Sequence, residues 1–422
     1  MIDRTQAPEV HPFGNLVMPD EQVEKLSNGI IFHRFSGGDQ PVCNLTLHLT
    51  GGMLEMGEAE CKLLLAMLTE GTATSTAEDI AEAIDFNGAR FATQPQNHFC
   101  VVDMAVLTSR LDDVLPVLRD IIVNPVFPEE RLEVARLKLK NSLLTMRHTP
   151  SAMASMGLIP LISGPENPLG KMLEDNDIDA VSSASLQSCH RRLLNPGRTN
   201  AYLSGLLDDD TVASVRTLLE SLPALGLGYD FNYYPETPQP AGSMVSTDMP
   251  STLQSAIACG IPAVGRSHPD YIPLRYTVMA LGGYFGSRLM SNIREEKGLT
   301  YGINAGLLGG LDGAHVYIGT LTDRSNTELV IEEIRKELAD MAVNPPQGEE
   351  LERFRTYAMT CLAELLDNPQ SVMQYYGSRN LVGTPDNYFA EQLNVLKSLT
   401  PEVMSRISEK YLSPDSMRIS LA

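Results

Sequence analysis

The sequence predicts an α+β fold built from two tandem homologous domains, each a mostly antiparallel sheet with helices packed on one face. Three observations predict it. Strand and helix patterns follow one another in mixed order with a hairpin signal, the tripeptide Val-Asn-Pro at 123–125 recurs at 343–345, and a Gly- and Pro-rich stretch at 226–242 separates two halves of similar length. We therefore expect domains over residues 1–225 and 243–422, joined by a linker over 226–242.

The internal repeat extends beyond one tripeptide. The acid pair Glu129-Glu130, which opens a helical pattern, recurs 220 residues later as Glu349-Glu350. Near the end of each half, a dipeptide that ends in proline separates a helical pattern from a strand pattern. The dipeptide is Asn195-Pro196 in the first half and Ser413-Pro414 in the second, and the two prolines are 414 − 196 = 218 residues apart. Ordered matches at nearly one offset indicate a tandem duplication.

Hydrophobic periodicity and turn residues predict the individual elements. Asn28-Gly29 is a hairpin turn signal, and Thr76 three residues before Asp79 is typical of a capping box. In the first half we expect strands at Asn44–Leu49 and Phe99–Val106, and helices at Lys62–Leu68, Ala77–Phe86 and Leu111–Val123. In the second half we expect strands at Ser255–Gly260 and His315–Leu321, and a helix at Glu328–Met341.

Composition narrows the class of protein. The chain has 422 residues, with 53 Asp and Glu against 32 Lys and Arg, so its net charge is −21. An acidic surface repels phosphates, which argues against nucleic acid and membrane as partners. No apolar run approaches the ~18 residues of a membrane helix, residues 1–17 lack the apolar core of a secretory signal, and the six cysteines form no Cys-x-x-Cys pair. We expect a cytoplasmic protein with reduced thiols.

The most informative segment is Ala280–Gly302, ALGGYFGSRLMSNIREEKGLTYG. It predicts a glycine-rich entry, a helix of about three turns that stops at Gly298, and a strand that begins near Tyr301. We interpret Gly282, Gly283 and Gly286 as residues that permit a tight turn and close helix packing, in preference to a phosphate cradle. The segment resembles the pitrilysin/insulinase family of zinc metallopeptidases, including its mitochondrial-processing-peptidase-like members, whose second domain carries the pattern GG…SRL…IRE..GL.Y. The resemblance implies the metallopeptidase/LuxS-like half-shell, in which two α+β halves form one side of a clam-like shell.

The resemblance fails at the metal site. The family binds zinc through H-x-x-E-H, two histidines on one helical face with a glutamate that acts as base, on a helix that ends in Gly-Thr. Those positions are Lys62, Leu65 and Ala66 here. The family's third ligand is a glutamate on a later helix, but Lys138–Met146 contains no acid. No two of the eight histidines lie three to five residues apart. We expect no metal and no cofactor in this chain.

The resemblance implies that Arg294 and Tyr301 are the pair that the second domain supplies to the catalytic chamber. Arginine can hold substrate carbonyls with its planar fork, and a tyrosine hydroxyl can donate a hydrogen bond to the oxyanion. From residue type alone, Arg294 could instead be a solvated helix residue that pairs with Glu295 or Glu296, and Tyr301 a half-buried strand residue.

A second implied site is the edge strand that pairs with extended substrate. It matches residues 87–93, NGARFAT, and Phe91-Ala92 stands where the family has Asn-Ala. Binding there works by strand addition. Because the Asn is absent, a role of Phe91 and Ala92 in the core or at an unused edge is the alternative.

The chain lacks the metal-binding residues but keeps Arg294 and Tyr301, which suggests that two different subunits supply the zinc and this pair. We expect the zinc-free subunit of a heterodimeric insulinase-family peptidase, inactive alone, which contributes both residues in trans to peptide hydrolysis by an H-x-x-E-H-bearing homologous subunit that holds the zinc. The alternative is a catalytically inactive structural or peptide-binding homodimer of the same fold. An autonomous protease with an unrecognised site is the third interpretation.

Overall fold

The computed structural model describes residues 14–164, 167–231, 242–249, 252–309 and 313–422. The first half contains β1 (Gln22–Lys25), β2 (Ile31–Ser36), β3 (Val42–Thr50), α1 (Met53–Met56), α2 (Glu58–Met67), α3 (Ala77–Phe86), β4 (Arg90–Pro95), β5 (Phe99–Leu107), α4 (Leu111–Val123), α5 (Glu129–Arg147), α6 (Pro150–Ser163), α7 (Asp175–Ala180), α8 (Ser183–Leu193), β6 (Thr199–Gly205) and α9 (Asp209–Glu220). The second half contains β7 (Met244–Ser246), β8 (Gln254–Ala263), α10 (Tyr271–Gly282), η4 (Met290–Glu296), β9 (Thr300–Gly309), β10 (Ala314–Asp323), α11 (Thr327–Val343), α12 (Gly348–Glu364), α13 (Pro369–Val382), α14 (Tyr388–Ser398), α15 (Pro401–Tyr411) and β11 (Arg418–Leu421).

Two sheets of matching topology confirm the predicted fold class. The first has the strand order β1-β2-β6-β3-β5-β4 and the second β7-β11-β8-β10-β9. One neighbouring pair is parallel in each, β2 with β6 and β7 with β11, and the other pairs are antiparallel. From β2 onward the first sheet therefore matches the second strand for strand, as a duplication requires.

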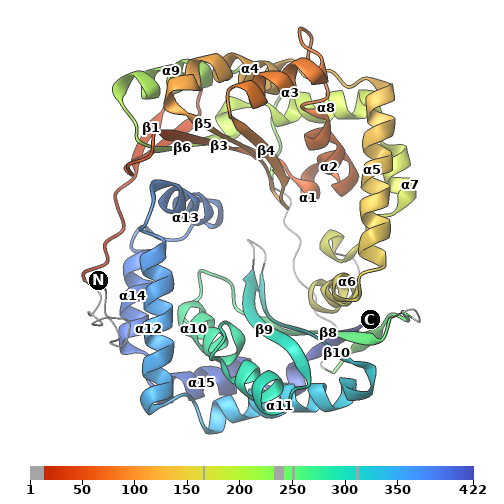
Figure 1. The fold of residues 1–422 in the computed structure, drawn as a ribbon, viewed down its shortest axis with the longest axis vertical. Helices are drawn as coiled ribbons and strands as arrows, with labels where there is room; N and C mark the ends of the chain where they lie inside the picture. Colours follow the sequence, from red (N-terminus) through yellow and green to blue (C-terminus); the bar gives the residue numbers. More distant parts are fainter. Residues whose placement is uncertain (1–13, 165–166, 232–241, 250–251, 310–312) are drawn as a thin grey trace, which may run out of the picture.

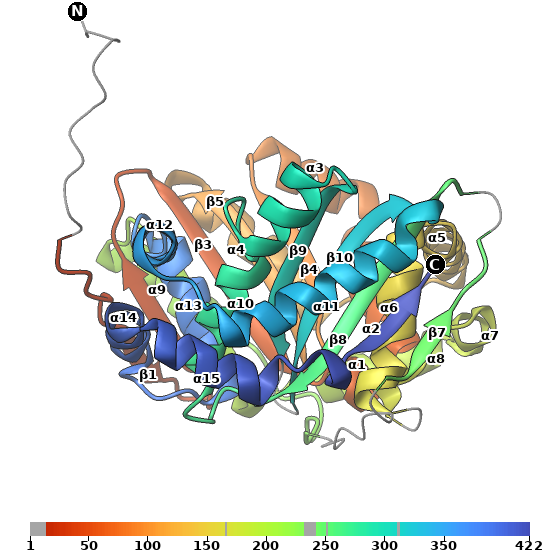
Figure 2. The same cartoon turned by 90° about the horizontal axis from the view of Figure 1, so that it is seen from below.

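Each sheet has its own helical layer and its own core. Helices α3, α4, α8 and α9 lie outside the first sheet, and α10, α11 and α15 lie across the second (Figures 1 and 2). The two largest clusters of buried apolar side chains fill the spaces between each sheet and its helices. The sheets turn their other faces toward each other across the middle of the molecule (Figure 1).

The two halves exchange one helix each, which the sequence did not predict. Helix α6 packs on β8 and β11 of the second sheet, and α13 packs on β2 and β6 of the first, so both lie between the sheets (Figure 1). Both helices begin with proline, Pro150 and Pro369, at an offset of 369 − 150 = 219. The contact is tight, because a β-carbon on Gly260 would lie 2.8 Å from Cδ1 of Ile162 and 3.0 Å from Cδ1 of Leu158.

Most local predictions are confirmed. Helices α3 and α4 have the expected bounds, and the capping box is present, since the Asp79 amide donates to Thr76 Oγ1 at 3.2 Å and the Thr76 amide to Asp79 Oδ2 at 2.9 Å. Gly29 joins β1 to β2 with φ +99°. The domain boundaries stay a prediction, because residues 232–241 of the expected linker, like 1–13, lie outside the described residues.

Two further observations bear on location. Within the described residues, no helix combines the length and the apolar character needed to cross a bilayer. All six cysteines are free. The cytoplasmic location stays a prediction.

Candidate functional site

The glycine-rich segment turns the chain from α10 into the motif helix. Gly282 is the last residue of α10, and a β-carbon there would lie 2.6 Å from the Ala305 β-carbon on β9. Only glycine permits so close an approach of helix and strand. Gly283 is equally crowded, because a β-carbon on it would lie 2.8 Å from the Met279 Cα. Gly282 and Gly283 therefore permit close packing, as expected.

The motif helix differs from the predicted three-turn helix. It is η4, a π-helix over Met290–Glu296, and Gly298 ends it with φ +61°. Wide-turn hydrogen bonds run from the Lys297 amide to the Asn292 carbonyl at 3.1 Å and from the Leu299 amide to the Ile293 carbonyl at 3.0 Å. A π-helix has about one residue more per turn than the hydropathy period of an α-helix predicts, so the sequence pattern does not reveal it. Such wide turns are frequent at functional sites.

Charged contacts anchor η4 to α11 and α12. The Arg288 guanidinium, just before η4, donates to both Glu350 carboxylate oxygens at 2.8 and 3.0 Å and to Asp340 Oδ2 at 2.9 Å. Asn292 donates to Glu337 at 2.7 Å. A bidentate Arg–carboxylate pair fixes orientation as well as position. These contacts therefore hold η4 on the side that faces α11 and α12, so side chains of its next turn can point away from those helices.

Glu333 completes this anchor. Lys297 and Lys336 both donate to its carboxylate, and those hydrogen bonds lower the pKa of Glu333 to about 2. Sequence reasoning missed the anchor. The available signal was the spacing of Glu333, Glu337 and Asp340 on α11, which puts three acids on one helical face.

Arg294 and Tyr301 lie together at the exposed end of this segment. The Arg294 guanidinium carbon is 5.8 Å from the Tyr301 ring centroid and 4.8 Å from that of Phe285, so the cation contacts both aromatic rings. Tyr301 is 93% exposed. Glu295 is 4.0 Å from the Arg294 guanidinium, at the limit of an ion pair. Phe285 was not predicted as part of the site, since its place in a glycine-rich turn carries no chemical signal.

The exchanged helix α6 forms a wall beside Tyr301. A cavity of about 460 Å³ is lined by Tyr301 and Asn304 on β9, by Tyr317 on β10 and by the first turn of α6. Ser155 of α6 contacts the Tyr317 hydroxyl at 3.1 Å. The two halves of the chain therefore build this hollow jointly.

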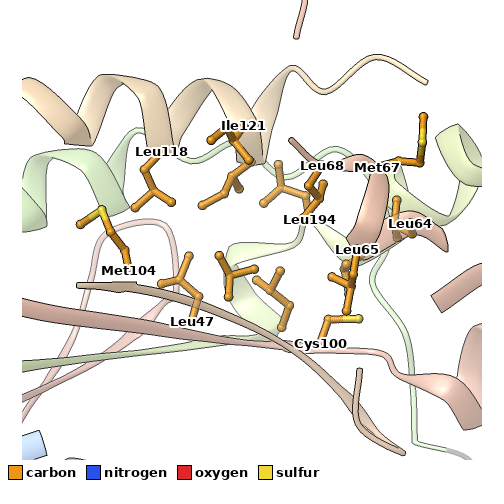
Figure 3. Packing of buried hydrophobic residues seen from close by; sticks show 14 of the residues in the cluster. Leu47, Leu64, Leu65, Met67, Leu68, Cys100, Met104, Leu118, Ile121 and Leu194 are labelled. Carbon is orange, nitrogen blue, oxygen red and sulfur yellow. The ribbon is translucent and has the colours of Figure 1, made fainter. Parts of the chain in front are cut away.

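The three degenerate zinc-motif positions have other roles. Lys62 pairs with Glu58 at 2.5 Å one helical turn away. Leu65 is 3% exposed and points into the first core near Cys100 (Figure 3). Ala66 is exposed. An ammonium, a leucine and an alanine offer no lone pair, so these residues do not fit zinc. In the described part of the chain, no group of three or more His, Cys, Asp or Glu side chains could hold a metal ion.

The predicted peptide-binding strand is β4, at the edge of the first sheet. Phe91 is half-buried against the first core and pairs with Met104, and Ala92 is half-buried and pairs with Asp103. Among the described strands β4 pairs only with β5. Its use by substrate stays a prediction.

Comparisons with known proteins agree with this architecture. Residues 180–357 match the family described as "Peptidase M16 inactive domain". A relative from Rickettsia felis named "Uncharacterized zinc protease" is 24% identical over 340 residues, which cover 79% of this chain and 81% of the relative. The crystal structure of a peptidase M16 inactive domain from Pseudomonas fluorescens has a TM-score of 0.86 at 22% identity and covers 96% of this chain and 98% of that chain.

A longer protein also shares the fold. The periplasmic protease PqqL from Escherichia coli has a TM-score of 0.74 at 16% identity, covering 99% of this chain but 49% of that chain. The resemblance predicted from Ala280–Gly302 is thus confirmed over both sheets. Residues 180–357 of this chain are thus similar to the M16 inactive domain, and Lys62, Leu65 and Ala66 stand at the zinc-motif positions of the first half.

Proposed function

We propose that this chain is the non-zinc-binding subunit of a heterodimeric M16 peptidase and that it lends Arg294 and Tyr301 to peptide hydrolysis at a partner subunit's zinc. One observation carries the proposal. Arg294 and Tyr301 lie together and Tyr301 is almost fully exposed, whereas Leu65 at the position of the catalytic base is a core residue. Arg294 and Tyr301 lie on a segment that the ion pairs to α11 and α12 hold in place, so both side chains are available to a substrate bound on another chain.

The two side chains would have separate tasks. The planar fork of Arg294 suits hydrogen bonding to backbone carbonyl oxygens of the peptide. The Tyr301 hydroxyl makes no hydrogen bond within the described residues, so it is free to donate to the oxyanion that forms at the scissile carbonyl. The Arg294 guanidinium contacts the Tyr301 ring, so both groups lie within reach of one substrate.

A longer protein of the same fold offers a parallel for a second subunit. This chain corresponds to 49% of the PqqL chain, so it amounts to about half of that longer M16-like protein. The other half would come from a separate H-x-x-E-H-bearing homologous subunit. That subunit would hold the zinc, and no step would run through a metal on this chain.

The test mixes this chain with an H-x-x-E-H-bearing M16 subunit from the same source and follows cleavage of a quenched fluorescent peptide. Tyr301→Phe removes the oxyanion donor, and we expect kcat to fall about 100-fold or more. Arg294→Ala should raise KM as well, because it removes a contact made before the transition state. Arg353→Ala, an exposed arginine on α12, is the matched control. Full activity in both Tyr301→Phe and Arg294→Ala mixtures would exclude the role in trans.

A catalytically inactive structural or peptide-binding homodimer is the second candidate. The outer edge of β4 favours it, because no described strand pairs there and a peptide could add as a further strand. In that case the chain alone would sediment as a dimer and bind unstructured peptide, and mixing with the zinc-binding subunit would produce no cleavage. Replacing half-buried Thr93 by proline, which removes a backbone donor on the edge that faces away from β5, would then weaken peptide binding.

A further inference from the structure

A second pocket lies in the second half, between α10, α13 and α14, and we name it the arginine pocket. Its volume is about 250 Å³, and the described residues that line it include Arg266, Arg275 and Arg379 but no aspartate or glutamate. The chain as a whole carries 53 acids against 32 basic residues. A cavity lined by three arginines and no acid therefore opposes the overall charge of the protein.

Two of the three arginines have no compensating charge in the described part of the chain. Arg379 forms ion pairs with Glu21 and, at 3.2 Å, with Asp386. Within the described residues, Arg266 and Arg275 make no ion pair, and Nε of Arg266 is buried without a hydrogen-bond partner. Arg266 does donate from Nη1 to Ser378 Oγ at 3.2 Å, which orients its guanidinium. Arg266 is a partly buried cation without an anion, which is costly, and Arg275 is an exposed cation beside it, so an anion that binds there would compensate Arg266.

Two tyrosines, Tyr375 and Tyr388, line the pocket beside these cations. Tyr375 donates to Gln392 at 3.1 Å. Burial raises the pKa of Tyr375 and Tyr388, and nearby Arg275 opposes that shift only in part. Both tyrosines therefore stay protonated at neutral pH. The donors that remain for an anion are therefore the guanidinium groups, whose planar forks match a carboxylate or phosphate.

The duplication shows that the pocket belongs to the scaffold. In the first half, a cavity of about 550 Å³ beside Lys62 is lined by Met146, Met156 and Ile159. Adding 219 to each number gives Leu365, Tyr375 and Ser378, and all three line the arginine pocket. Each half thus builds a cavity against the helix that it exchanges, and the lining differs: the first-half cavity includes acids such as Glu58 and Asp177, whereas the described lining of the arginine pocket includes none.

The geometry points to an oxyanion-binding site in the arginine pocket, where Arg266 and Arg275 hold a carboxylate or phosphate group. The inference does not depend on the proposed peptidase role, because it needs no partner subunit and no contribution from Arg294 or Tyr301. The anion can come from a free small molecule or from the carboxylate end of a peptide, and the shared chemistry is the same.

Binding is measured by calorimetry on the full chain with three probes, in sodium chloride at matched ionic strength. The probes are inorganic phosphate, succinate, and a hexapeptide with a free C-terminal carboxylate, and the C-terminal amide of the same peptide is the peptide control. Arg275→Gln removes an exposed side chain and should leave the fold intact. We expect it to raise the Kd of the bound probe about tenfold to 100-fold. Arg266→Gln should act alike, and Arg275→Lys less strongly, because lysine keeps the charge without the fork.

Arg353→Gln is the matched control and should leave every Kd unchanged. Phosphate or succinate binding that weakens in Arg275→Gln supports a free anion as the source. Binding of the free-carboxylate peptide alone, weakened in the same variant, supports a peptide end. No binding of any probe beyond chloride, or equal binding by wild type, Arg275→Gln and Arg266→Gln, overturns the inference.

Discussion

At the scale of single residues, Leu65 shows why the metal site could not return by one substitution. Its side chain is 3% exposed and packs between α2 and the first sheet (Figure 3). The position that would carry a base therefore carries part of the core. The neighbouring position, Ala66, is exposed.

Leu65→Glu should lower the free energy of unfolding by about 3 kcal/mol or more, because it buries a carboxylate without a partner. Ala66→His is the matched control, and we expect it to stay within about 0.5 kcal/mol of wild type. Urea unfolding followed by circular dichroism measures both. Equal stability of the two variants would show that α2 turns the Leu65 side chain toward solvent.

His48 on β3 predicts a loss of stability in acid. Its ring is 8% exposed, lies 4.8 Å from that of Tyr202, and has no partner for Nδ1 among the described residues. Burial, with a smaller contribution from nearby His33, lowers the pKa of His48 to about 4 from 6.5. Between those pH values the unfolded chain binds the extra proton and the folded chain does not, so stability falls as the pH is lowered through this window.

The expected contribution is at most about 3 kcal/mol at pH 4, from ~1.4 kcal/mol per pKa unit. Thermal unfolding of wild type and His48→Gln from pH 7.5 to pH 4 measures it, and the variant should have the shallower pH slope. His148→Gln, at an exposed position, is the control and should keep the wild-type slope. Parallel slopes for all three proteins would contradict the assignment to His48.

At the scale of elements, local signals predicted what local forces determine. Helix α3 was predicted with its bounds because a capping box and a clear apolar period mark its ends. The motif helix was not predicted in its π form, and the side-chain contacts that hold η4 come from α11 and α12. Those contacts join residues more than 40 positions apart, beyond what a local pattern can show.

Arg288→Ala tests the anchor of η4. Removing a guanidinium that bonds both Glu350 and Asp340 should cost about 1–3 kcal/mol of unfolding free energy. Arg110→Ala is the control, because its pair with Asp113 is exposed and should contribute less than about 0.5 kcal/mol. Chemical denaturation measures both. If the two variants lose the same small amount, the anchor does not hold η4.

At the scale of the whole molecule, the repeat predicted two equivalent halves but not their exchange of α6 and α13. Offsets in sequence show that two segments are alike, and they do not say which sheet each helix covers. The candidate site, like the fold, was predictable only where a local sequence pattern marks it. The motif predicted Arg294 and Tyr301, whereas the α6 wall beside them and the arginine pocket depend on packing between distant segments.

The exchange predicts that neither half folds alone. Fragments 1–231 and 242–422 should each aggregate when produced separately and should purify together when co-expressed, because each sheet needs the other fragment's helix. Leu158→Asp in the first fragment should abolish co-purification, since Leu158 is 2% exposed against the second sheet. Ile159→Asp, at a position 38% exposed, is the control and should co-purify. Two stable, monomeric fragments would contradict this dependence.

The exchanged helices also record how such a chain could arise. A single half with this topology would leave the inner face of its sheet uncovered and its inner helix unpacked. Two identical copies would solve both problems by swapping that helix about a two-fold axis, which is a low-cost route to a dimer. Joining the two copies end to end preserves the swap as α6 and α13, 219 residues apart. The chain thus has the internal architecture of a domain-swapped homodimer within one polypeptide.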